Sequence, residues 1–267
     1  MSALVFDMRW IVDQRLDLSP LVPERLAKLA RKKIEALPIN TTREKLTVGD
    51  VFKVKGNDPE HLRFVGTDDR CDNIGAKLNG GDVTVEGDAG MLLGAQMKRG
   101  TIAVDGSAGV LTGASMAGGE IRVRRDVGDQ AGGVAFGSTM GMKGGFISVG
   151  RNAGDLLGER LRRGLIVVGG KAGDYAGGRM IAGTLVLKGG AGRYAGYGNR
   201  RGSLIFTEKP RNLLPTYVDS GVMEFDYLRI LEKWLREQDV RIRLGARARR
   251  LMGDMAVLGK GEMLILA

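Results

Sequence analysis

Few side chains of this 267-residue chain have the types and spacing that acid–base, nucleophilic or metal chemistry requires. The chain contains one histidine, His61, and one cysteine, Cys71. A single histidine excludes a multi-histidine metal site, and a single cysteine excludes both an internal disulfide and an iron–sulfur cluster held by this chain alone. We interpret His61 as a boundary residue and Cys71 as a small buried side chain. The sequence therefore predicts no catalytic residue and no metal ligand.

Three aspartates recur at equivalent places and could suggest paired carboxylates. Asp129, Asp155 and Asp174 each directly follow a glycine. Short acidic side chains at such places commonly accept hydrogen bonds from nearby backbone N–H groups, which favours a role in turns over acid–base catalysis. The serines have no nearby histidine that could activate them as nucleophiles.

The 43 glycines invite comparison with phosphate-binding loops. The pattern G-x-x-x-x-G-K-[ST] does not occur, and the nearest stretch, residues 169–172, lacks both the hydroxyl and the spacing. The regular recurrence of the glycines favours a structural role.

Basic residues are the main candidates for ligand binding. The formal net charge of +10 favours acidic partners or polyanionic ligands. Basic side chains recur near the ends of successive sequence repeats, at Lys98, Arg99, Lys143, Arg160, Arg162, Arg163, Arg179, Arg200 and Arg201. We call this set the basic stripe, and we expect it to be either a solvated corner or a docking site for a polyanion. The arginine-rich stretch 241–250 is a second candidate, and nucleic acid is disfavoured because interleaved aromatic residues are missing.

A 19-residue repeat carries these side chains. Its copies begin at Gly81, Gly100, Gly119, Gly145, Gly164 and Gly183. The third and fifth positions are aliphatic, which predicts a short strand with one buried face. The tenth and fourteenth positions are glycine, which indicates tight turns or crowded backbone. The third copy contains about seven extra residues near 134–140, a degenerate copy covers 62–80, and a last strand at 202–206 closes the series.

The repeat predicts an all-β protein, a right-handed parallel β-helix of about seven 19-residue turns over residues 62–209. Each copy is too short to hold a strand and a helix, and its strand cannot bury its own apolar face. Stacking solves both problems because each strand then pairs with its equivalent one turn on. We expect the seventeenth position to fill a corner of the core, with Met97, Met116, Met142, Leu161 and Met180. A leucine-rich repeat is disfavoured because its consensus pattern is absent.

The two flanks are expected to cap the open ends of the stack. Residues 1–61 predict a small α/β cap with a helix over 23–37 and a strand over 47–55. Residues 210–267 predict a helical extension, with a helix from about 224 to 238 that carries an apolar face. No run approaches 18 apolar residues and the first ten residues lack a leader pattern, so we expect a cytoplasmic protein without membrane association.

Written as G-x-[VIL]-x-V-x-G-x-A-G-x-x-x-G, residues 62–206 resemble the glycine-motif β-helix shared by the C-terminal domain of glutamate synthase and the C subunit of formylmethanofuran dehydrogenase. The opening stretches QRLDLSPLVPERL and IEALPINTTREKLTVGDVFKV, together with the chain length, look like the latter. They look most similar to its bacterial version, which belongs to the formyltransferase/hydrolase complex of methylotrophs.

That resemblance implies a non-catalytic scaffold and docking subunit. Its expected partners are a formyltransferase subunit, an amidohydrolase-like subunit and a further subunit of a hetero-oligomeric complex. The complex is expected to transfer a formyl group from tetrahydromethanopterin to a furan coenzyme and to release formate, with no cofactor bound by this chain. Because such furan coenzymes carry glutamyl chains, the basic stripe is expected to guide that tail.

Two alternatives remain at the level of sequence. One is the C subunit of a CO2-reducing formylmethanofuran dehydrogenase, in which a partner subunit holds a molybdenum or tungsten pterin. The other is a glutamate-synthase-type β-helix module that positions the domains of an amidotransferase. The insertion near 134–140 is an expected contact point, because insertions in such repeats map to loops on one face.

Overall fold

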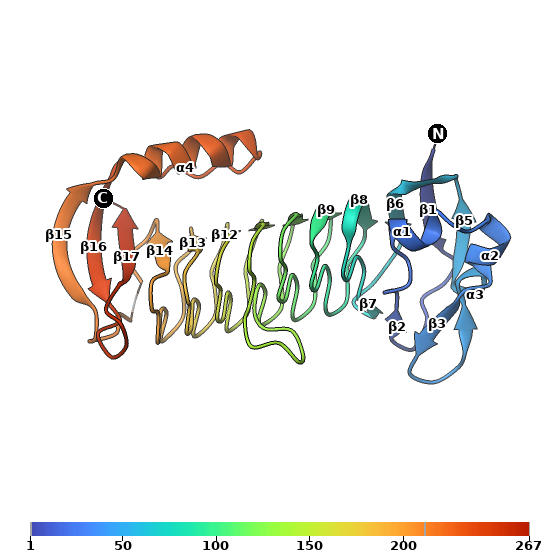
Figure 1. Cartoon of the computed structure of the whole chain (residues 1–267), viewed down its shortest axis with the longest axis horizontal. Helices are drawn as coiled ribbons and strands as arrows, with labels where there is room; N and C mark the ends of the chain where they lie inside the picture. Colours follow the sequence, from blue (N-terminus) through green and yellow to red (C-terminus); the bar gives the residue numbers. More distant parts are fainter. Residues whose placement is uncertain (1, 211, 267) are drawn as a thin grey trace.

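The protein is an elongated ladder of strands with its chain ends at opposite ends of the ladder (Figure 1). The structure is a computed structural model that describes residues 2–210 and 212–266. A sheet of 13 strands has the order β15-β16-β17-β14-β13-β12-β11-β10-β9-β8-β6-β1-β5, and a sheet of four has the order β4-β3-β2-β7. These two sheets confirm the prediction of a protein built mainly of β-strands.

The strands of the repeat region run parallel and in register. They are β6 (Asp58–Val65), β8 (Asn79–Glu86), β9 (Arg99–Val104), β10 (Glu120–Val123), β11 (Phe146–Val149), β12 (Leu165–Val168), β13 (Thr184–Leu187) and β14 (Ser203–Phe206). Ile121, for example, pairs with Ile102 on one side and with Ile147 on the other. Equivalent positions of successive repeats therefore lie next to one another.

A second line of contacts joins the repeats at their ninth position. Isolated parallel bridges connect Ala89, Ala108, Val127, Ala153, Ala172 and Ala191 in succession. Small side chains at this position allow the backbones to approach, which explains why the sequence keeps alanine or valine there.

The core consists of stacked aliphatic side chains from the repeats. The strand positions predicted to face inward are buried, as are the methionines and leucine of the seventeenth position. Glycine is required by both conformation and crowding at Gly113, where φ is +65° and an added Cβ would lie 2.5 Å from Ile147 Cδ1. Gly94 has the same relation to Ile121, so the fourteenth-position glycines make room for the isoleucine ladder.

The insertion forms a loop on one edge of the ladder. The bridge between Val127 and Ala153 spans 26 residues where its neighbours span 19, so seven residues are added, in agreement with the sequence. The loop projects from the edge away from helix α4 (Asp226–Glu237), as does the loop of residues 254–259 (Figure 1). Ala135 of the insertion packs against Leu111 and Ala114.

The N-terminal region extends the sheet. Strand β1 (Ala3–Met8) runs parallel to β6 and antiparallel to β5 (Phe52–Lys55) in the large sheet. In the small sheet, β2 (Leu16–Asp17) lies between β3 (Pro38–Thr41) and β7 (Cys71–Asp72). Strand β4 (Leu46–Thr47) pairs with the other edge of β3. The aromatic rings of Phe6, Phe52 and Phe64 meet beneath this end, with Phe6 and Phe64 stacked at 5.0 Å. These rings fill the N-terminal end of the core, next to the stacked aliphatic side chains of the repeats.

The predicted helix over 23–37 is wrong in its extent. Two short helices are present instead, α1 (Pro23–Leu26) and α2 (Arg31–Glu35), and Ala30 between them is extended. Leu26 and Ile34 are both buried in the core. The chain changes direction between them because core packing overrides the local helical tendency of the intervening residues.

The predicted strand over 47–55 is correct only in its second half. Residues Val48–Val51 form α3, and β5 follows it. Thr47 and Asp50 have the positions of a capping box, and the Asp50 carboxylate accepts hydrogen bonds from the backbone N–H and the hydroxyl of Thr47, at 2.8 and 2.7 Å, which stabilises the helical turn.

The C-terminal region adds both a helix and strands. Helix α4 (Asp226–Glu237) confirms the prediction, and its Leu228 and Leu235 are buried on the outer face of the sheet. The sequence did not predict β15 (Val218–Glu224), β16 (Arg247–Gly253) and β17 (Gly261–Leu266). Strand β17 pairs in parallel with β14, and β16 and β15 follow antiparallel, so these strands cover the last repeat.

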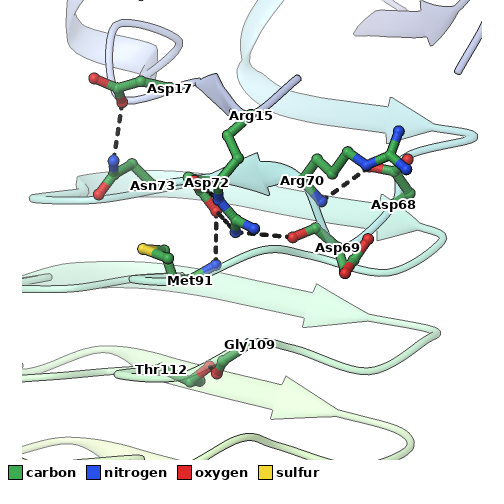
Figure 2. A network of polar contacts seen from close by, with 10 residues as sticks. All are labelled: Arg15, Asp17, Asp68, Asp69, Arg70, Asp72, Asn73, Met91, Gly109 and Thr112. Carbon is green, nitrogen blue, oxygen red and sulfur yellow. Dashed lines mark hydrogen bonds and ion pairs between the residues drawn. The ribbon is translucent and has the colours of Figure 1, made fainter. Parts of the chain in front are cut away.

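A polar network joins the N-terminal region to the first repeat (Figure 2). Both carboxylate oxygens of Asp72 accept hydrogen bonds from Arg15, whose guanidinium also donates to the carbonyl of Asp69 at 3.0 Å. Asp72 also accepts the backbone N–H of Met91 at 2.9 Å. One carboxylate thus connects the N-terminal region, the degenerate repeat and the next repeat.

In the described part of the chain, no helix has the length and apolarity needed to cross a membrane.

Candidate functional site

The residues of the basic stripe are all exposed, and several occupy equivalent backbone positions. The N–H groups of Lys98, Lys143, Arg162 and Arg200 each donate to a carbonyl of the preceding repeat, at Leu78, Met116, Met142 and Met180 respectively. The repeat therefore aligns these basic side chains along the ladder as the sequence predicted. Their role in binding stays a prediction.

Three members of the stripe come together in one depression. Arg160, Arg179 and Arg200 line a cavity of about 400 Å³, which we call the basic depression. Thr139 of the insertion forms one wall, and Asp254 with its loop neighbours forms another. The other six members, Lys98, Arg99, Lys143, Arg162, Arg163 and Arg201, are not part of this lining.

The arginines of the basic depression are partly fixed by the protein. Arg160 donates to the carbonyl oxygen of Thr139 at 3.0 Å, and Arg179 forms an ion pair with Glu159 at 3.0 Å. A guanidinium carries five N–H donors, so each arginine keeps donors that can bind an anionic ligand. The depression can therefore hold carboxylate or phosphate groups.

The carboxylate of Asp254, which lines the basic depression, is buried. Burial raises its pKa, but hydrogen bonds that include those from the backbone N–H groups of Ala256 and Gly198 outweigh burial, and the net pKa is lowered. Asp254 is therefore ionised at neutral pH and holds the loop of residues 254–259 against the last repeat.

Beside the basic depression lies a cluster of aromatic rings that the sequence did not reveal. Tyr175 and Tyr194 stack at 4.9 Å, and Tyr197 meets Tyr175 edge-on at 6.0 Å. They line a cavity of about 640 Å³, the tyrosine pocket, together with Asp155, Leu156, Glu159, Asp174, Gly178 and Arg179. Tyr175 and Tyr194 occupy the twelfth position of their repeats, so reading that column down the repeats could have found the stack.

The three recurring aspartates, Asp129, Asp155 and Asp174, accept hydrogen bonds from backbone N–H groups, as predicted. The residues that donate these bonds differ from those expected. The carboxylate of Asp129 accepts the backbone N–H of Asp155, and that of Asp155 accepts the N–H of Asp174, at 2.8 and 2.7 Å. The bonds therefore connect successive repeats, whereas the sequence suggested bonds within one repeat. Asp174 also binds Arg193, and the hydrogen bonds from that residue lower the pKa of its carboxyl group.

Cys71 is buried, as the sequence predicted, whereas His61 lies exposed beside two carboxylates. His61 lies exposed on β6, 3.0 Å from a carboxylate oxygen of Asp58 and 3.4 Å from one of Asp82. Hydrogen bonding to Asp58 raises the pKa of His61. Cys71 is buried in the core, and burial raises its pKa to about 12.

The second basic candidate is divided between a loop and a strand. Arg241 and Arg243 line a shallow cavity of about 500 Å³ with Glu232 and Arg236 of α4, while β16 contains the end of the stretch. Within residues 2–210 and 212–266, no group of three or more His, Cys, Asp or Glu side chains is placed to hold a metal ion.

Comparisons with known proteins identify similar proteins over nearly the whole chain. No protein-family model matches it. The chain is 39% identical over 262 residues to the C subunit of the formyltransferase/hydrolase complex Fhc of Methylorubrum extorquens, covering 97% of this chain and 98% of that protein. It also matches a chain in the crystal structure of the formyltransferase/hydrolase complex FhcABCD from Methylorubrum extorquens in complex with methylofuran. That match has a TM-score of 0.93 and 39% identity, and it covers 98% of this chain and 99% of the other.

Identity at this level over nearly the full length of both chains, together with the same fold, shows that the chain belongs to the family of C subunits of formyltransferase/hydrolase complexes.

Proposed function

We propose that this protein is the scaffold and docking subunit of a formyltransferase/hydrolase complex that moves a formyl group from tetrahydromethanopterin to a furan coenzyme and releases formate. The observation that carries the proposal is the full-length match to a chain of a complex that contains methylofuran. Catalysis is assigned to a formyltransferase subunit and an amidohydrolase-like subunit, and one further subunit is present in the assembly. This chain supplies surfaces that hold them.

The architecture that serves this role is a right-handed parallel β-helix of about seven turns over residues 62–209. The in-register strands and the second line of bridges at the ninth position support it. Residues 1–61 and 210–267 act as caps that protect the open ends from pairing with other chains. A crystal structure of the protein would test the handedness and the number of turns. A cytoplasmic location stays a prediction, which fractionation of the native cell would test.

Co-purification tests the proposed function. The tagged chain, recovered gently from its native cell, is expected to bring down a formyltransferase and an amidohydrolase-like protein in fixed ratio. A pterin-bearing subunit in their place would indicate the CO2-reducing relative, and glutaminase partners would indicate the glutamate-synthase-type module. Either of these results, or recovery of the chain alone, would contradict the proposal.

The basic stripe is proposed to guide the glutamyl tail of the furan coenzyme. The tail is a polyanion, and the stripe consists of exposed cations aligned by the repeat. Arg160, Arg179 and Arg200 bring three guanidinium groups to one cavity, the basic depression, where a carboxylate can bind. A docked tail would keep the coenzyme bound while its furan end moves between partner subunits.

Charge reversal in the assembled complex tests this role. Replacing Lys98, Arg99, Arg162 and Arg163 by glutamate is expected to weaken coenzyme binding by about tenfold or more, and by less at high salt. Arg160→Gln with Arg200→Gln tests the basic depression separately. Lys171→Glu with Lys188→Glu is a control, since both lysines are exposed and outside the stripe. Unchanged coenzyme binding and turnover in the reversed variants would refute the role.

A further inference from the structure

The tyrosine pocket has a composition unlike the rest of this basic chain. Of its charged lining residues, Asp155, Glu159 and Asp174 are acidic and only Arg179 is basic. The neighbouring basic depression has three arginines and one aspartate, and it shares Arg179 and Tyr197 with the tyrosine pocket. Two cavities of opposite charge therefore lie side by side on this face, and they suit different ligands.

The three aromatic rings of the tyrosine pocket are unusually exposed to solvent for a cluster of stacked aromatic side chains. Tyr175, Tyr194 and Tyr197 are 37%, 43% and 47% exposed. In the repeat that begins at Gly100, the equivalent positions are Leu111 and Ala114. These two side chains are covered, because Ala135 of the insertion packs on them. Clustered, exposed tyrosines next to apolar surface are typical of protein–protein contact sites, where they supply large areas with little loss of conformational freedom.

The carboxylates of the pocket differ in how far they are neutralised. Glu159 pairs with Arg179 at 3.0 Å, and Asp174 pairs with Arg193 at 2.8 Å. Among the ion pairs of the described residues, none includes Asp155, whose carboxylate accepts only the backbone N–H of Asp174. A negative charge at the rim of an aromatic cavity thus has an unused acceptor oxygen.

We infer that the tyrosine pocket docks a lysine or arginine side chain presented by a partner subunit. The cation would lie over a tyrosine face and pair with the carboxylate of Asp155, while its alkyl stem packs on Leu156. The anionic coenzyme tail suits the basic depression and is repelled by the acidic lining here. The inference rests on the proposed function, because it takes the occupant from the subunits of the same complex.

Site-specific cross-linking in the assembled complex identifies the occupant. The complex is produced with Tyr194 replaced by the photoreactive residue p-benzoylphenylalanine, irradiated, digested and examined by mass spectrometry. The expected product joins this position to a partner peptide that contains a lysine or arginine next to the cross-linked residue. A product with a peptide that lacks a basic residue, or no partner product at all, would overturn the inference.

Variants measure the contribution of each group to assembly. Tyr175→Ala and Tyr194→Ala are each expected to weaken binding of this chain to the remaining subunits by about tenfold, whereas the phenylalanine variants keep the ring face and stay within about threefold. Asp155→Asn is expected to weaken binding and to flatten its salt dependence. Tyr227→Ala is the matched control, because Tyr227 of α4 is 40% exposed and lies outside the pocket.

The outcomes separate this inference from the proposed function. If the unaltered chain does not assemble with the formyltransferase and hydrolase subunits, the proposed function fails. If it does assemble, and the alanine and asparagine variants bind like the unaltered chain, only the assignment of the tyrosine pocket fails. Circular dichroism of each variant shows whether a loss of binding comes from unfolding.

Discussion

At the scale of single residues, burial decides whether Cys71 can react. Its thiol lies in the core on β7, and burial raises its pKa to about 12, so the reactive thiolate is almost absent at neutral pH. We expect no labelling of the native protein by a thiol reagent over hours, and complete labelling in guanidinium chloride. Labelling of the native protein within minutes would show that the thiol is accessible.

His61 provides a second residue-scale prediction because it is the only histidine in the chain. The hydrogen bond to Asp58 raises its pKa above 6.5. We expect NMR titration to give a value above 6.5, which Asp58→Asn lowers and Asp82→Asn lowers less. A value at or below 6.5 would show that the carboxylates do not act on the ring.

The same shift sets the direction of a small pH effect on stability. A raised pKa in the folded state means that the protonated imidazole is favoured by folding. The contribution is therefore fully present below pH 6.5, the ordinary pKa, and it is lost as the pH rises through the raised value. His61→Gln is expected to remove this pH dependence from the unfolding curve.

At the scale of elements, the fourteenth-position glycines limit how the turns can be substituted. Gly113 has φ of +65°, and a Cβ there would also lie 2.5 Å from Ile147 Cδ1. We expect Gly113→Ala to lower the free energy of unfolding by about 2–4 kcal/mol, from backbone strain plus crowding. Urea denaturation measures the change.

Gly190 supplies the control for that prediction. Its φ is +79°, but no heavy atom of the described residues outside its immediate neighbours lies within 4 Å of an added Cβ. Gly190→Ala is therefore expected to remove only about 1 kcal/mol, the strain contribution. Equal losses at the two positions would show that crowding by the isoleucine ladder has no effect.

Helix α4 is held at its C-terminal end by Arg122 of β10. The Arg122 guanidinium donates to the backbone carbonyl and to Oε1 of Gln238, and it lies 5.9 Å from the centre of the Phe146 ring. We expect Arg122→Ala to destabilise the docked helix by about 1–3 kcal/mol, because carbonyls at a helix end lose a cationic donor. Faster hydrogen exchange in residues 226–237 would show it, with Arg122→Lys giving an intermediate rate. Unchanged exchange would mean that apolar contacts such as those of Leu228 and Leu235 hold the helix without Arg122.

At the scale of the whole molecule, stability depends on contacts between neighbouring repeats and on the two ends of the ladder. Each repeat contacts mainly the repeats before and after it, so a weakened end can open without the rest. The Arg15–Asp72 pair connects the N-terminal region to the first turns (Figure 2). We expect Arg15→Ala to increase hydrogen exchange in residues 2–72 while residues 146–206 keep their protection.

Arg43→Ala is the control for this whole-molecule prediction. Arg43 forms an ion pair with Asp13 in which both side chains are largely exposed, and such pairs contribute little. Arg15→Ala is expected to cost about 1–2 kcal/mol, because it leaves the buried carboxylate of Asp72 without its charged partner. Uniformly faster exchange along the whole chain would contradict local opening at one end.

The sequence by itself determined the repeat region and one helix. The alternation of aliphatic residues located the strands β8 to β14, the glycine columns located the turns, and the apolar face of residues 224–238 located α4. The strands could be predicted because buried and exposed residues alternate along them. A single short alternating segment is ambiguous, but the same pattern recurs in every copy of the 19-residue repeat, and this recurrence removes the ambiguity. The basic stripe followed from the same register, since aligned repeats place equivalent side chains in a row.

The tertiary structure alone decided the arrangement of the two terminal regions and of the candidate sites. The break between α1 and α2 and the pairing of β1 and β17 with the ladder depend on packing partners far away in sequence. The basic depression joins Thr139, Arg179 and Asp254, and the tyrosine pocket joins rings from successive turns. A periodic pattern specifies which side chains point outward, but not which of them meet. Their meeting depends on the stacking register and on where the two loops fold back, and both are set by contacts between distant residues.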